Sequence, residues 1–161
     1  MTAPFPKGAA GLLRRLRADR GGAAAVEMAL VAPILALALA AAYDLSQGFA
    51  ARLDLVQAAQ RSAELATSLG QVRTDYSFLQ TEAVTAATTS GAKNPSAAVD
   101  AWLECNGVRQ AQMNAVCPAG QQFARYVSVE VNDTYFPLFT GAGLLNAGGV
   151  PIRGAATVRI Q

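Results

Sequence analysis

Apolar residues fill one continuous stretch near the start of the chain, from Ala23 to Tyr43, in which Glu27 is the only charged residue. A helix needs roughly 20 predominantly apolar residues to cross the hydrocarbon core of a bilayer. The stretch therefore predicts a transmembrane helix over residues 23–43. Pro33 lies inside it and is a candidate helix kink, because proline has no N–H to bond back to Ala29.

The helical pattern continues beyond the predicted span. Apolar residues recur at spacings of three and four and form one face: Leu45, Phe49, Leu53, Val56, Ala59, Ala63 and Ala66. This pattern predicts an amphipathic continuation over residues 44–69, with Gly70 as its C-cap. We expect the C-terminal part of the chain to cover most of this face, and part of the face to pack on other subunits as well.

Residues 70–161 are expected to form a domain that contains both helix and sheet. Strict alternation places Val127, Val129 and Val131 on one face of a strand, and residues 152–160 alternate in the same way. A third strand is expected in AVDAWLEC, a short helix within residues 75–91, and a turn at Asn132-Asp133. The predicted fold class is α+β, with the long N-terminal helix packed on a small C-terminal antiparallel β-sheet.

An apolar, glycine-rich segment, residues 135–150, separates the last two predicted strands. Two interpretations remain open for it. The segment is either a flap that covers the sheet or an exposed patch for a partner or the membrane surface.

Charge is distributed unevenly along the chain. Residues 1–22 hold five basic residues and one acid, so the remainder carries −2 of the total net charge of +2. Basic residues before an apolar span favour the cytoplasmic side of the membrane. We therefore expect residues 1–22 to be a cytoplasmic leader and residues 70–161 to lie outside the cytoplasm. No aromatic residues interleave with these arginines, which argues against nucleic acid as a partner.

Disulfides persist outside the cytoplasm, and the chain has two cysteines there, Cys105 and Cys117. They enclose a short loop-like segment, so we predict a disulfide worth about 3 kcal/mol in the chain-entropy model. The chain has no histidine. We expect no metal site, no cofactor and no enzymatic activity, because the sequence shows no nucleophile–base pair, paired carboxylates or phosphate loop.

The head of the apolar stretch allows three interpretations. It is a plain membrane anchor, or a secretory signal cleaved near Ala42, although that leader would exceed the usual 15–30 residues. The pair Arg14-Arg15 is a weak match to a twin-arginine signal. The third interpretation rests on spacing: Gly22 precedes Ala23, and Glu27 is the fifth residue counted from Ala23.

A basic leader that ends in Gly, followed by an apolar helix with Glu at its fifth position, is typical of prepilins. The run RGGAAAVEMALVAPILALALAAAYDLSQGFAARLDLVQAAQRSAELA resembles the TadE/TadG-like proteins of the Tad (tight adherence, Flp) pilus system. Asp44 stands where that family usually has an acid. Met28, Gln60 and the pair Ala63-Glu64 depart from the family pattern.

The resemblance implies a pseudopilin, or minor pilin, of the bacterial inner membrane with a periplasmic C-terminal domain. A prepilin peptidase would cut between Gly22 and Ala23, and Glu27 would pair with the new amine of its own chain or of a neighbour. The implied partners are that peptidase, other Tad pilins and pseudopilins, and the inner-membrane platform. The alternative is a membrane-anchored periplasmic or pilus-tip binding module, similar to an adhesin.

Overall fold

The computed structural model describes residues 21–68, 73, 75–138 and 148–161. Among these residues the elements are α2 (Gly21–Ser68), α3 (Phe78–Thr89), β1 (Ser96–Cys105), β2 (Val108–Arg109), β3 (Phe123–Tyr135) and β4 (Val150–Arg159). The chain divides into two compact units, one that ends at Tyr43 and one that runs from Asp44 to Gln161. The predictions for residues 1–20, for Gly70 as a C-cap and for residues 139–147 lie outside the described residues.

The second unit contains one antiparallel sheet with the strand order β2-β1-β3-β4. The long strand β3 lies inside it and pairs with β1 from Phe123 to Asn132 and with β4 from Tyr126 to Tyr135. Alternation along β3 directs Val127, Val129 and Val131 to one face, where all three are fully buried. The predicted alternation of this strand is confirmed, and so is that of β4.

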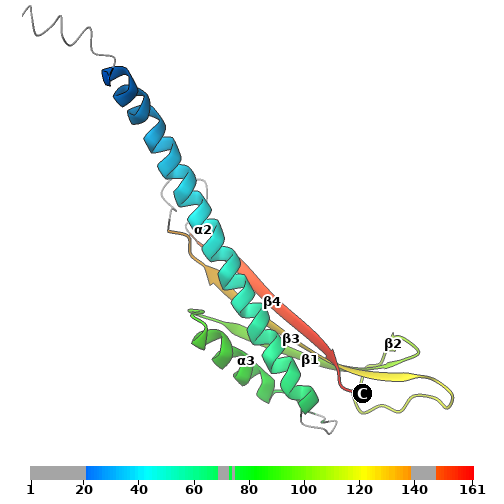
Figure 1. The fold of residues 1–161 in the computed structure, drawn as a ribbon. Coiled ribbons are helices and arrows are strands. Elements are labelled where there is room, and N and C mark those ends of the chain that lie inside the picture. The colour runs from blue at the N-terminus through cyan, green and yellow to red at the C-terminus, as the bar shows by residue number, and fades with distance from the viewer. Residues whose placement is uncertain (1–20, 69–72, 74, 139–147) are drawn as a thin grey trace, which may run out of the picture. The chain divides into compact units, whose positions relative to one another are not determined.

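Both helices of the second unit contribute to the same core. Figure 1 shows α3 and the later turns of α2 lying against the sheet. The core joins small and apolar side chains of the three elements: Leu55, Ala58, Ala59, Ala63, Ala66, Leu79, Ala83, Ala87, Val127, Val129 and Val131. The predicted α+β fold, a long helix packed on a small antiparallel sheet, is therefore confirmed, as is the short helix before β1.

The prediction of a turn at Asn132-Asp133 is wrong. Both residues belong to β3, where Asn132 pairs with Ser96 and Arg153, and Asp133 pairs with Ile152. Instead of closing a turn on its own strand, the Asp133 carboxylate accepts N–H bonds from Lys93 and Asn94, at 3.0 and 3.2 Å. The Asp133 side chain, which favoured a turn by local propensity, is thus satisfied by partners that are distant in the sequence.

The apolar face predicted for the second half of α2 is covered over only part of its length. Ala59, Ala63 and Ala66 are buried, but Leu45, Phe49 and Leu53 are all more than half exposed. The buried face is rotated towards Leu55, Ala58 and Ser62, whose hydroxyl bonds to the Ala58 carbonyl at 2.9 Å. The domain therefore covers the later part of the predicted face and leaves its first three members exposed, while the expected packing on other subunits stays a prediction.

Close backbone approach decides which helix face is buried. Gly154 of β4 lies directly against α2, and a Cβ at this position would overlap the backbone of Leu55 and Val56. Only a residue without a side chain permits this contact, so the strand packs against the turn that contains Leu55. Leu55 in this turn is fully buried, whereas Phe49 and Leu53 lie on an exposed flank of the helix.

Candidate functional site

The first half of α2 presents the residues that the sequence singled out for processing and assembly. Gly22, Ala23 and Glu27 all lie within the first two turns of the helix, which begins at Gly21. Glu27 is four residues after Ala23, so the two are separated by about 6 Å along the axis. The structure therefore places Glu27 about one turn from the position where cleavage after Gly22 would create an amine.

The helix that carries these residues, α2, is long and apolar enough to cross a membrane. Among the described residues it is the one helix for which this holds. Its large side chains are mostly exposed, among them Met28, Leu30, Ile34, Leu37 and Leu39. Such a surface is not stable in water, because each exposed Leu or Ile forfeits about 1.5–3 kcal/mol of burial free energy. Pro33 lies inside α2, which continues as a helix on both sides of it.

Asp44 joins the helix to the end of β3, within the second unit. Its carboxylate Oδ1 accepts the backbone N–H of Leu138 at 3.0 Å, and its backbone carbonyl accepts the Tyr135 hydroxyl at 3.2 Å. Asp44 is 7% exposed, although it belongs to a residue type that is almost never buried without partners. This side chain therefore holds the segment after β3 against the start of the domain.

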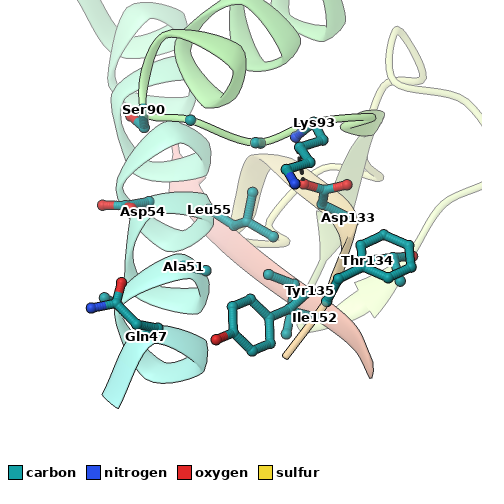
Figure 2. A pocket seen from close by; sticks show the side chains of 14 residues that line it. Gln47, Ala51, Asp54, Leu55, Ser90, Lys93, Asp133, Thr134, Tyr135 and Ile152 are labelled. Atoms are coloured by element: carbon teal, nitrogen blue, oxygen red, sulfur yellow. Dashed lines mark hydrogen bonds between the residues drawn. The ribbon is translucent and has the colours of Figure 1, made fainter. Parts of the chain in front are cut away.

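Gly48 is the second feature of this junction. A Cβ on Gly48 would lie 3.4 Å from the Tyr135 ring, so the ring rests on the glycine one turn after Asp44. Figure 2 shows the Tyr135 hydroxyl directed towards the helix. Gly48 and the Tyr135 ring are therefore in close contact, within one turn of the Asp44 carbonyl that accepts the Tyr135 hydroxyl.

A pocket of about 260 Å³ lies beside this junction, between α2, the residues after α3, and the end of β3. Its polar lining includes Gln47, Asp54, Lys93, Asp133 and Tyr135. Asp133 already accepts two backbone N–H bonds there, so its charge is largely committed to holding the loop after α3. The bonds of Asp133 thus join the loop after α3 to β3 at the wall of this small pocket.

The other end of the sheet carries the predicted disulfide. Cys105 at the end of β1 is bonded to Cys117, and their Cα atoms are 5.6 Å apart. The bridge closes the loop that contains β2 and Met113, a residue that packs against the core. The predicted disulfide is therefore confirmed, and it lies at the opposite end of β3 from Tyr135.

The face of the sheet that points away from the helices is polar and partly aromatic. Trp102 stacks on Tyr126 of the neighbouring strand, with ring centroids 5.4 Å apart. Arg109 lies over the Trp102 ring and also forms a 2.8 Å ion pair with Asp100. These groups are satisfied by one another, which makes the face a stable, solvated surface.

One carboxyl group of the domain, that of Asp75, has a pKa shifted by its local hydrogen bonds. At the start of α3, N–H and hydroxyl bonds from Ser77 lower the pKa of the exposed Asp75 carboxyl, which is an ordinary effect of local hydrogen bonding. Within the described part of the chain, no three Asp, Glu or Cys side chains come together in a way that could hold a metal ion.

Among the described residues, one apolar helix near the N-terminus precedes a disulfide-bonded α+β unit, and it suggests a membrane anchor for that unit. Residues 22–64 match the family model described as TadE-like protein, in agreement with the resemblance to the TadE/TadG-like proteins. The match lies within α2 and is consistent with a protein associated with the Tad pilus system. No curated protein and no solved structure matches the chain.

The sequence did not predict the contact between two residues of the junction, Asp44 and Tyr135. Asp44 was noted only for its place in the family pattern, and Tyr135 only as part of an apolar segment. Their sequence separation of 91 residues explains this, because no local pattern reports a contact over such a distance. The sequence did contain one signal for this contact, an acidic residue directly after the predicted span. An acidic side chain that is buried there requires a partner.

Proposed function

We propose that this protein is a pseudopilin, or minor pilin, that contributes to the assembly of a Tad pilus. The observation that carries the proposal is the spacing of Gly22, Ala23 and Glu27 at the head of one continuous apolar helix, inside the region that matches the TadE-like family. In this proposal, cleavage after Gly22 creates an amine at Ala23, and Glu27 supplies a carboxylate about one turn away.

In this proposal a prepilin peptidase removes residues 1–22 on the cytoplasmic side of the inner membrane. The C-terminal domain lies in the periplasm, and the mature chain joins other Tad pilins or pseudopilins on the inner-membrane platform. The protein acts as a structural subunit, without enzymatic activity, a cofactor, a metal ion or nucleic acid as a partner. On the exposed apolar flank of α2, Leu53 is available to neighbouring subunits.

The chemistry of Glu27 fits this role. A carboxylate in a membrane-spanning helix costs about 2.5–3.5 kcal/mol on insertion scales unless it finds a partner. After cleavage, the ammonium group of Ala23 supplies such a partner, either within one chain or between neighbouring chains. Pairing between chains also fixes the axial register of adjacent helices, because a one-turn slip separates the two charges.

Mass spectrometry of the mature protein tests the proposal directly. We expect Ala23 as the N-terminus in cells that contain the prepilin peptidase, and the uncut chain in cells that lack it. Gly22→Val should block cleavage, since the enlarged side chain precedes the scissile bond, whereas the matched variant Gly21→Val should leave Ala23 as the N-terminus. A mature N-terminus near Ala42 would show instead that the stretch is a secretory signal.

A further inference from the structure

Exposed apolar side chains gather where α2 leaves the predicted span. Leu45 and Phe49 are 63% and 56% exposed on the helix, and Phe136 and Leu138 are 49% and 70% exposed just after β3. Four large apolar side chains so exposed within one small region are uncommon on a soluble surface. We call these four residues the exit collar.

The exit collar lies on more than one side of the helix. Phe136 lines the pocket together with Gln47 and Ala50, so it lies on that flank of α2. Two helical residues correspond to a rotation of about 200°, which puts Phe49 almost opposite Gln47. The Leu138 N–H is bonded to Asp44, which lies on the helix between the flank of Gln47 and the flank of Phe49. The collar therefore surrounds much of the helix close to residue 44.

Charge is absent from the surface of this part of the helix. Between Glu27 and Arg52, Asp44 is the only charged residue of α2, and it is buried and accepts the Leu138 N–H. The intervening residues 28–51 extend for about 36 Å as helix, whereas a hydrocarbon core is about 30 Å thick. If one face of the hydrocarbon core lies at Glu27, the uncharged surface of the helix extends beyond the opposite face. The exit collar lies near that opposite face.

We propose that the exit collar is a lipid-binding surface, by which the globular domain rests on the outer leaflet of the membrane. The collar is continuous along the chain with the membrane-spanning residues, and Asp44 acts as a positioning residue that keeps Leu138 at the bilayer surface. Tyr135 suits the same level, since tyrosine favours the membrane interface with its hydroxyl bonded to a polar group. The proposal depends on α2 spanning the membrane but not on cleavage after Gly22.

Depth-dependent quenching of tryptophan fluorescence tests this proposal on the full chain in phosphatidylcholine vesicles. Trp102→Phe removes the native tryptophan, and Leu138→Trp or Phe136→Trp adds one in the collar. Val116→Trp is the matched control, because Val116 is 91% exposed in the disulfide loop at the far end of β3. With lipids brominated near the glycerol end of their acyl chains, both collar variants should lose most of their emission, and the control should keep it.

The role of Asp44 is tested in the Leu138→Trp protein. Asp44→Ala removes the acceptor for the Leu138 N–H and should reduce the quenching, while Asp44→Asn keeps an oxygen there and should restore it. Circular dichroism of each variant verifies that the domain is folded. Equal loss of quenching in the two Asp44 variants would overturn the positioning role.

Three other outcomes would overturn the lipid contact itself. Unquenched collar emission that shifts with the protein-to-lipid ratio would assign the collar to a second copy of the chain. Unquenched emission independent of that ratio would show that the protein itself covers the collar. Failure of the chain to float with the vesicles would show that α2 does not anchor the protein in the membrane. Cleavage after Gly22 is measured separately, and its detection would support the proposed processing even in that case.

Discussion

Glu27 is the residue of the apolar half of α2 whose chemistry conflicts most with its surroundings. It is exposed on a helix whose neighbouring side chains are apolar, and the nearest proposed partner is the amine that cleavage would create at Ala23. The conflict disappears if that amine and the carboxylate form a pair, because each then offsets the desolvation of the other. In the proposed function, the charge of Glu27 would therefore link processing to assembly.

Replacing Glu27 by Val should leave membrane insertion intact and impair pilus assembly. Valine is tolerated in hydrocarbon, but it removes the partner of the Ala23 amine, and loss of a pair worth about 1.4 kcal/mol already lowers an association constant tenfold. Glu27→Asp retains the charge and serves as the matched control. Membrane fractionation measures insertion, and counts of sheared pili measure assembly; normal piliation of the valine variant would contradict the pairing role.

At the residue scale, sequence reasoning identified chemistry better than it identified contacts. The two cysteines were correctly paired because only one pairing exists and the charge pattern indicated an oxidising compartment. Asp133 was misread because an Asn-Asp pair favours turns locally, while its carboxylate is satisfied by Lys93 and Asn94 some 40 residues away along the chain. Local propensity carries no information about such a partner.

At the scale of elements, periodicity predicted the strands and helices but not the face of α2 that is buried. A period of two on β3 gives an unambiguous inward face, because alternate residues are strictly opposed. A helix with apolar residues around much of its circumference offers several faces. Here the alanines and the contact between Gly154 and Leu55 determine the choice, and that contact depends on the tertiary fold.

Two neighbouring leucines on α2 should therefore respond differently to the same substitution. Leu55 is fully buried in the core and Leu53 is exposed on the flank. Leu55→Ala should lower the free energy of unfolding by about 2–5 kcal/mol, and Leu53→Ala should change it by less than about 0.5 kcal/mol. Chemical denaturation in detergent measures both; an equal loss would show that the flank containing Leu53 is covered.

At the scale of the whole molecule, the basic residues before the apolar helix and the disulfide after it agree with the proposed orientation in the membrane. Five basic residues before the span favour a cytoplasmic N-terminus, and the bond between Cys105 and Cys117 requires an oxidising compartment for the domain. These two signals are physically independent, since one acts during insertion and the other after it. Their agreement supports a domain outside the cytoplasm.

The two cysteines therefore report the orientation of the full chain in cells. Treatment with a polyethylene glycol maleimide should leave the wild-type protein unmodified, and should add two adducts only after reduction. Replacing Arg14, Arg15 and Arg17 by Gln weakens the insertion signal, so a fraction of chains should retain the domain in the cytoplasm and acquire two adducts without reductant. Arg153→Gln, a matched charge removal on the exposed face of β4, should have no effect. Wild-type protein that is modified without reduction would place the domain in the cytoplasm and exclude the periplasmic orientation.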